Sequence, residues 1–437
     1  MAITQVNSSA TTAPAPQSTN TAALSVVTTL FFMWGFLTAL NDILIPHLKP
    51  IFDLNYTQIL LIQFAFFSSY FIFSIPSGKV VDWVGYKRAM VIGLLTMAVG
   101  AFMFIPAAAV PSYPLFLAAL IVLAAGMTVL QVSANPYVAV LGSPKTASSR
   151  LNLTQAFNSV GTMIGPYLGG LIILTTVPTM DEIHRMAPDV LRSFRIEQAS
   201  SVKLPYLGFG LILIALAIFI AFVKLPVIES AVHHKGEYTA SIWQYKHLVL
   251  GAVGIFVYVG AEVSIGSLLI NYMTQPQFGG VSPKTAATIV GFCYWGGAMV
   301  GRFIGSAVLQ KVRTNLVLGT AAFVAFLLVC TSMLTFGHVA MWSLILVGLF
   351  NSVMFPSIFT SGIAELGPLT SKGSTLLIMA IVGGALIPLA TGKLADTPSV
   401  GLHHSFILAA ICYLYIMYYG YIGSKPTGPG ITEAVSQ

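Results

Sequence analysis

One short stretch, set between two long apolar segments, decides the fold, and it reads Gly78-Lys79-Val80-Val81-Asp82-Trp83-Val84-Gly85-Tyr86-Lys87-Arg88. Its glycines permit a tight turn, because a residue without a side chain can adopt backbone conformations that other residues avoid. An acid at a helix end can hold a neighbouring helix terminus or an arginine in one conformation and release it in another. The stretch therefore predicts a conformational gate formed by Gly78, Asp82, Gly85, Lys87 and Arg88.

The composition around this stretch is that of a membrane protein. Hydrophobic residues make up 56% of the 437 residues and charged residues 8%, and the mean hydropathy is +0.87, whereas soluble proteins carry about 25% charged residues. This number of charged residues is too small to cover the surface of a globular protein in water. Most of the exterior must therefore face lipid. The net charge of +7 comes without any long basic run, which argues against nucleic acid as a partner.

Twelve apolar segments are long enough to span a bilayer, which takes roughly 20 helical residues. They cover 22–47, 58–78, 88–108, 112–141, 150–176, 204–224, 247–273, 284–309, 315–336, 338–362, 372–394 and 402–423. A longer gap at 177–203 has the mixed charges of an amphipathic surface piece. We therefore predict an all-α membrane protein with a tail at 1–20, a six-helix bundle at 21–224, a linker at 225–246, a second six-helix bundle at 247–424 and a tail at 425–437.

The two predicted bundles repeat each other in sequence. Asn135-Pro136-Tyr137-Val138 in the fourth span matches Phe355-Pro356-Ser357-Ile358 in the tenth, and Gly165-Pro166 in the fifth matches Ile387-Pro388 in the eleventh. Such a pattern indicates one unit duplicated in parallel, so the two bundles should be pseudo-symmetric. Twelve spans arranged as six plus six are typical of a transporter.

The basic residues indicate how the chain is oriented. An even number of spans places both termini on one side of the membrane. The basic residues assigned to the loops and ends of that side are Lys79, Lys87, Arg88, Lys145, Arg150, Lys224, Lys235, Lys246, Arg302, Lys311, Arg313, Lys372 and Lys425, which is most of the 20 in the chain. By the positive-inside rule both termini are cytoplasmic.

Two acids, Asp42 and Glu262, fall inside predicted spans. A carboxylate at the centre of a span costs about 3 kcal/mol on insertion scales, so it normally faces a polar cavity and marks an ion or substrate path. Such a carboxylate could bind a proton and couple transport to a proton gradient. The alternatives are a helix-end acid for Asp42 and a structural ion pair for Glu262.

Uncharged amides gather in the same spans and give the candidate substrate-binding residues. Amides and carboxylates pair with adjacent hydroxyls, as in a sugar; the alternative for each is a hydrogen bond between helices. The full set is Gln131, Asn135, Gln155, Asn158, Glu262, Asn271 and Asn351. No histidine lies in the middle of a span, and neither HExxH nor a phosphate-binding GxxxxGKS/T motif is present, so we expect no enzyme activity, no cofactor and no structural metal.

The gate stretch resembles the loop pattern of the major facilitator superfamily. Four further strings are similar to its fucose, galactose and glucose:cation symporter family, from bacterial inner membranes: Leu40-Asn41-Asp42-Ile43-Leu44, Ala134-Asn135-Pro136-Tyr137-Val138, Arg150-Leu151-Asn152-Leu153-Thr154-Gln155-Ala156-Phe157-Asn158-Ser159 and Tyr258-Val259-Gly260-Ala261. The resemblance implies the major facilitator fold, an inner-membrane location and a monomer. It also implies proton coupling for Asp42 and a place in the sugar cavity for Asn158.

The chain departs from the fucose-transporting members of this family at two positions. Those members carry Glu where Gln131 stands and Gln where Glu262 stands, and a neutral Gln131 cannot release a proton. The pair resembles the glucose/galactose branch, in which we expect Gln131 and Glu262 to hold sugar hydroxyls.

The sequence thus predicts a secondary active transporter that imports a glucose- or galactose-type hexose with a cation by alternating access. A proton is favoured as the coupling ion, although an ionised Asp42 could hold sodium together with Asn41, since both offer oxygen ligands. The alternatives are a facilitated sugar uniporter and a proton-coupled transporter of another small polar metabolite such as fucose.

Overall fold

The computed structural model describes residues 19–52, 56–110, 112–173, 185–226 and 241–429, without the side chains of 40–51, 56–61, 63, 166–173 and 192. Within these residues every regular segment is helical. The first half contains α1 (Thr21–Phe52), α2 (Tyr56–Ala109), α3 (Tyr113–Val140), α4 (Ala147–Ile173), α6 (Pro188–Ser200) and α7 (Lys203–Phe222). The second contains α8 (Lys246–Met273), α9 (Pro283–Ile289), α10 (Gly296–Val308), α11 (Thr314–Leu334), α12 (Gly337–Asn351), α13 (Met354–Gly362), α14 (Thr370–Met379), α15 (Gly383–Ala395), α16 (Gly401–Ser405) and α17 (Ile407–Tyr418).

The helices agree with the twelve predicted spans. Ten helical segments of the described residues are long and apolar enough to cross a membrane. One of them, Phe64–Ala109, contains two predicted spans, because α2 runs through the predicted gate and turns at Gly85, where φ is 78° and ψ is 167°. α4 is not among the ten; its first half carries polar residues such as Arg150 and Asn152, and the side chains of 166–173 in its second half are outside the described part. Counting α2 as two spans and adding α4 gives twelve, which confirms the predicted all-α fold.

Four spans of the second half are interrupted. A π-helical segment, Val290–Trp295, separates α9 from α10, and another, Tyr419–Gly423, follows α17. α12 ends at Asn351 and α13 begins at Met354, while a short 3-10 segment separates α14 from α15. Irregular backbone inside a membrane is tolerated where it is buried in protein, and π-segments occur often at functional sites.

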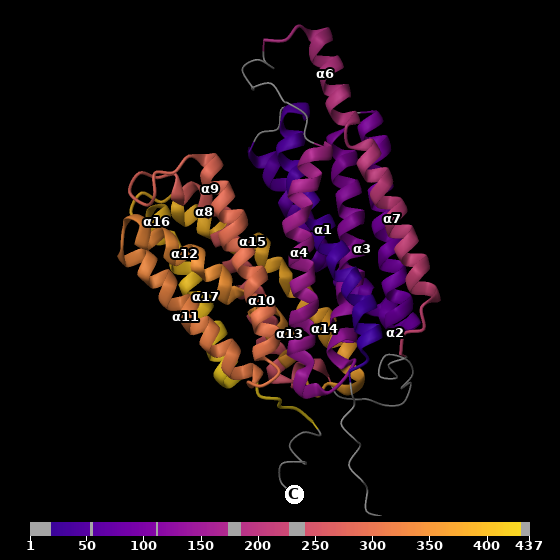
Figure 1. The fold of residues 1–437 in the computed structure, drawn as a ribbon, viewed down its shortest axis with the longest axis vertical. Helices are drawn as coiled ribbons and strands as arrows, with labels where there is room; N and C mark the ends of the chain where they lie inside the picture. The colour runs from indigo at the N-terminus through magenta and orange to yellow at the C-terminus, as the bar shows by residue number, and fades with distance from the viewer. Residues whose placement is uncertain (1–18, 53–55, 111, 174–184, 227–240, 430–437) are drawn as a thin grey trace, which may run out of the picture.

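The two halves stand side by side and contact each other mainly at one end of the molecule (Figure 1). There α4 packs against α10 and α13, and α14 packs against α2 and α3. The described ends of the chain lie at this same end, because Asn20 N donates to Leu141 O (3.5 Å) and Thr427 N donates to His247 Nδ1 (3.1 Å). We call it the terminal end. Toward the opposite end the ribbons of the halves diverge.

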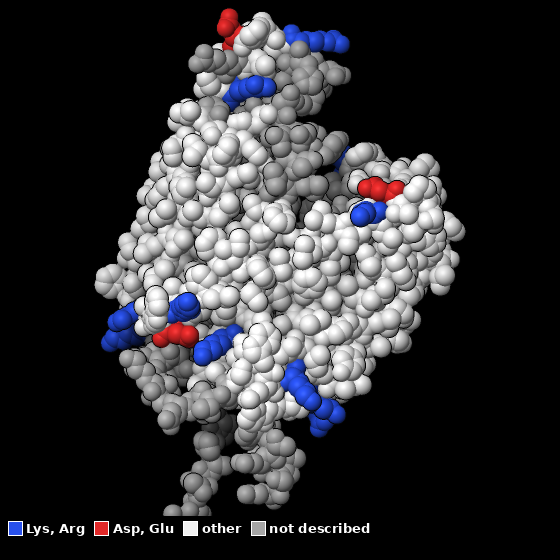
Figure 2. All heavy atoms as spheres, turned by 180° about the vertical axis from the view of Figure 1, so that it is seen from behind, with Lys and Arg blue, Asp and Glu red and all other residues white. Residues whose placement is uncertain are grey.

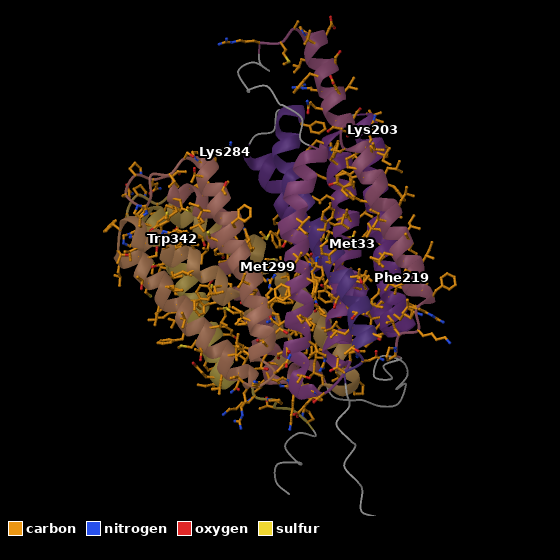
Figure 3. The ribbon with its side chains drawn as sticks, in the orientation of Figure 1. Met33, Lys203, Phe219, Lys284, Met299 and Trp342 are labelled. Carbon is orange, nitrogen blue, oxygen red and sulfur yellow. The ribbon has the colours of Figure 1, made fainter. Side chains whose placement is uncertain are left out.

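The surface has the layout of a membrane protein. On the face seen in Figure 2 the charged side chains lie toward the two ends, and the middle is uncharged. Phe219 and Trp342 lie on the outer flanks of the two halves, whereas Lys203 and Lys284 mark the end opposite the termini (Figure 3). Phe219 is 48% exposed and Trp342 is 43% exposed. Exposed aromatic side chains on these flanks are what a hydrocarbon surrounding permits.

The segment predicted to be amphipathic, 177–203, is helical over its second part, where α6 packs on α1 and α2. Its buried face includes Gln198 and Ala199, while Val190 and Ile196 are exposed. Residues 1–18, 227–240 and 430–437 lie outside the described part. The two tails, the linker and the bundle boundaries drawn from the sequence therefore stay predictions.

Gly85→Ala should destabilise the protein, because the backbone at φ 78° and ψ 167° is a conformation that is essentially restricted to glycine. The expected cost is about 1–3 kcal/mol, visible as a lower Tm of the purified protein in detergent. Gly392→Ala is the matched control, since a β-carbon there would meet no atom within 4 Å and alanine favours a helix. Equal Tm values for the two variants would contradict the turn at Gly85.

Candidate functional site

The contact between the halves at the terminal end is made of small polar side chains. Ser149 Oγ donates to Ser306 O (2.7 Å), and Ser306 Oγ donates to Ser149 O (3.2 Å). Asn152 Nδ2 donates to Arg302 O (2.7 Å). Further bonds of this kind join Ser148 to Thr360 (2.6 Å) and to Thr314 (2.9 Å), and Ser374 to Val132 O (3.2 Å). The first turns of α4 are thus bonded to α10, α11 and α13 of the other half.

Arg302 joins the same interface. The prediction that Arg302 belongs to a loop is wrong, because it lies inside α10, seven residues before Leu309 and so about 10 Å along the helix. Its Nη1 donates to Ser159 Oγ of the other half, and its Nε donates to Ser352 O (3.4 Å). One cation inside a membrane-spanning helix therefore links the two halves.

α1 and α4 lie in close contact through glycines. Asn158 Nδ2 donates to Phe31 O (2.8 Å). A β-carbon at Gly35 would collide with the backbone of Asn158, and one at Gly161 would collide with Phe32 O. Since these approaches leave no room for side chains, α1 and α4 form one rigid pair. Asn158 is half-buried, and one N–H of its amide is used to hold this pair together.

On α3, three buried polar atoms of Gln131 and Asn135 have no hydrogen-bond partner among the described residues. Gln131 is 3% exposed, and its Nε2 donates to Tyr70 OH (3.0 Å), but no described residue pairs with its Oε1. Asn135 is 0% exposed, and no described residue pairs with its Nδ2 or its Oδ1. Buried polar groups are almost always hydrogen-bonded, so each exception requires a reason such as a ligand or an ordered water.

Glu262 lies half-buried on α8 and is held from two sides. Its Oε1 accepts a hydrogen bond from Tyr258 OH (2.8 Å), and its backbone O accepts one from Tyr294 OH (3.1 Å). Tyr294 belongs to the π-segment between α9 and α10. Within the described residues Glu262 Oε2 makes no hydrogen bond, which leaves one carboxylate oxygen to accept bonds from a ligand.

Asn351 is held inside the second half. It is 0% exposed; its Nδ2 donates to Tyr294 OH (3.2 Å) and its Oδ1 accepts from Tyr413 OH (2.8 Å). Both functional atoms of this amide therefore have protein partners. Asn351 positions Tyr294, and through it the backbone at Glu262, in a network that joins α8, α12 and α17.

The remaining candidates are not brought together in the same way. Asn271 is exposed and follows Glu262 by nine residues, about 13 Å along the helix. Gln155 is 5% exposed on α4. Asn41 and Asp42 lie in α1, but their side chains are outside the described part. Among the residues the structure describes, no group of His, Cys, Asp and Glu could hold a metal ion.

The predicted gate residues divide between two roles. A β-carbon at Gly78 would collide with Thr375 Oγ1 of α14 in the other half, so glycine permits this approach of the halves. Lys87 Nζ donates to Ala221 O (2.8 Å) at the end of α7, where a cation is favoured by the helix dipole. Asp82 and Arg88 are exposed, and neither forms an ion pair within the described residues.

Arg302→Gln should loosen the terminal end, because it removes a charged donor that reaches Ser159 across the interface. Hydrogen bonds to charged groups contribute about 1.5–3 kcal/mol, so the population open at the terminal end should rise at least tenfold. Distances between spin labels on the two halves would measure this population. Arg185→Gln, at an exposed position, is the control, and the same distance distribution in both variants would contradict the role of Arg302.

Comparison with known proteins agrees with this architecture. The sequence profile described as Major Facilitator Superfamily matches residues 23–391. The chain is 52% identical over 406 residues to the glucose/galactose transporter of Brucella abortus, covering 92% of this chain and 94% of that one. It is 33% identical over 411 residues to the L-fucose-proton symporter of Escherichia coli, covering 92% and 93%.

A solved structure has the same fold. The crystal structure of the major facilitator transporter FucP in the outward conformation superposes with a TM-score of 0.85 at 32% identity, covering 92% of this chain and 98% of that one. The resemblance read from the sequence is confirmed. This multi-pass membrane protein belongs to the Major Facilitator Superfamily of transporters.

Proposed function

We propose that the chain imports a hexose of the glucose/galactose type together with a proton, by alternating access. The observation that carries this proposal is the set of three atoms on Gln131 and Asn135 that have no partner among the described residues, since buried amides of this kind suit a ligand that both donates and accepts hydrogen bonds. Relatives named glucose/galactose transporter and L-fucose-proton symporter support the substrate class and the coupling ion.

The two halves offer different groups to a sugar. The first half offers the Gln131 and Asn135 amides, and the second offers Glu262 Oε2, which can only accept when ionised. A sugar hydroxyl that donates to Glu262 can accept from an amide N–H at the same time. A site built to hydrogen-bond hydroxyls rejects molecules that lack them, because its own polar atoms would then stay unpaired. This chemistry excludes an apolar substrate.

The choice of a glucose/galactose-type hexose over fucose rests on Gln131 and Glu262. Fucose-transporting members of the family carry the carboxylate at the first of these positions and the amide at the second. The identity of 52% to a glucose/galactose transporter, against 33% to a fucose symporter, favours the same branch. In this arrangement Gln131 binds sugar and cannot take part in proton transfer.

Asp42 is the proposed proton site. It lies in α1, the helix that Asn158 fixes to α4. Proton loading would neutralise a carboxylate within the membrane and so lower the cost of a conformation in which that group is cut off from water. Sodium held by Asp42 and Asn41 is the alternative coupling ion, and uniport without any ion is the alternative mechanism.

The cycle follows from the contacts at the terminal end. In this structure hydrogen bonds of α4 with α10, α11 and α13 hold that end closed. With both termini cytoplasmic in a bacterial inner membrane, a sugar would enter from the periplasm, between the ends of the halves that diverge. Release would require these bonds to break while the opposite ends approach each other, as in other transporters built from repeats.

Asn135→Leu should weaken sugar binding and leave the fold as stable as before or more stable. Loss of two hydrogen bonds predicts a Kd for glucose or galactose about thirtyfold higher, measured by calorimetry on the purified protein. Tm should not fall, because an apolar side chain removes two buried unpaired atoms. Gln310→Leu, at an exposed position, is the control. A lower Tm with unchanged binding would make Asn135 a structural residue.

Asp42→Asn should abolish sugar accumulation driven by a proton gradient, while sugar exchange between the two sides continues. The measurement is uptake of glucose or galactose into proteoliposomes under an imposed proton or sodium gradient, with the wild-type protein beside the variant. Accumulation driven by sodium alone would assign Asp42 and Asn41 to a sodium site. Equilibration without accumulation under either gradient would leave a uniporter.

A further inference from the structure

An apolar groove opens on the outside of the second half. It has a volume of about 380 Å³ and lies between α10 and α11. Both helices pack against α12, and Leu349 and Phe350 at the end of that helix form part of the groove. Ile304 of α10 is 55% exposed and Leu316 of α11 is 46% exposed, so the walls of the groove face the surroundings of the protein.

The size and lining of the groove suit a hydrocarbon chain. Sites that hold small ligands measure roughly 300–1,000 Å³, and almost all of the surface here is apolar, with Thr320 and Ser352 as the polar side chains among its lining residues. In a membrane protein an outward apolar groove is in contact with lipid tails. The lining therefore points to part of an acyl chain as its occupant.

The mouth of the groove carries positive charge. Val312 lines the groove, and its two neighbours in the α10–α11 loop are Lys311 and Arg313. Both are exposed, and neither side chain makes a hydrogen bond or an ion pair within the part of the chain that the structure describes. The loop begins after Val308 and ends before Thr314, at the terminal end of two membrane-spanning helices. Basic residues at such a boundary attract anionic lipid headgroups.

We infer that this groove and loop bind an anionic phospholipid. Lys311 and Arg313 hold the phosphate, and an acyl chain of the same molecule lies between α10 and α11. Charge complementarity selects the headgroup and the apolar walls accept the tail. Neither part alone specifies this ligand: an apolar groove would accept any lipid, and two exposed cations would attract any anion.

The bound lipid would lie behind the interface that closes the terminal end. α10 forms one wall of the groove and packs with another face on α4. Ser352 lines the groove, and its carbonyl accepts from Arg302, whose guanidinium also reaches Ser159 of the other half. At Gly305, another lining residue, a β-carbon would meet Asn152 Nδ2 at 2.6 Å. An acyl chain there supports α10 in the position that the closed terminal end requires.

The test is titration of the purified full-length protein in non-ionic detergent with phosphatidylglycerol and, separately, with phosphatidylcholine, followed by native mass spectrometry. Phosphatidylglycerol should bind more tightly than phosphatidylcholine. Since each basic residue near a membrane surface contributes about 1 kcal/mol, or about fivefold in affinity, Lys311→Gln with Arg313→Gln should weaken its binding about thirtyfold. Leu316→Trp, which fills the groove, should weaken the binding of both lipids.

The matched control is Lys246→Gln with Lys372→Gln, which removes two exposed cations from the same end of the protein but none beside the groove; its affinity should stay within about twofold of wild type. Equal affinity for the two lipids, or no loss in the Lys311 and Arg313 double variant, would overturn the headgroup assignment. Competition by free inorganic phosphate at the concentration of the lipid would show an anion site instead. Unchanged binding in Leu316→Trp would overturn the place of the acyl chain.

Discussion

The structure depends on the hydrogen bonds between uncharged groups that join the two halves at the terminal end, which we call the seam. The same two halves must also separate there. Side-chain hydrogen bonds between membrane helices contribute only about 0.6 kcal/mol each, so reciprocal bonds such as those of Ser149 and Ser306 hold one end without locking it. A seam of buried ion pairs would be far more costly to open, because each charge would lose its partner. Arg302 is the charged member of the seam, and its Ser159 contact is to a neutral hydroxyl.

The residues from Arg150 to Ser159 show how one helix, α4, contacts three neighbouring helices. Arg150 donates to Val138 O and Ser143 O around the end of α3. Asn152 and Ser159 face α10 of the other half, and Asn158 faces α1. Each partner lies on a different side of α4, so most polar positions of this stretch are constrained by contacts. This explains why α4 is less apolar than the other spans and still lies inside the bundle.

Hydropathy predicted the spans well because length and apolarity are what a bilayer requires of a helix. The count of basic residues misplaced Arg302, since such a count assigns an arginine to a loop unless a partner inside the membrane is known. The partner, Ser159, is distant in sequence and gives no signal of its own. The amides show the same limit: Asn135 with unpaired atoms and Asn351 with two tyrosine partners look alike in sequence, and only packing separates a binding group from a supporting one.

The rigid pair of α1 and α4 connects the proposed ion site to the seam. A β-carbon at Gly165 would lie 2.9 Å from Phe36 O, so the two helices are in close contact along much of their length. Asp42 lies on α1, and the serines that bond to α10 lie on α4. With Asp42 as the proposed proton site, a displacement of α1 on protonation would be passed to α4 through these contacts, and so to the hydrogen bonds that close the terminal end.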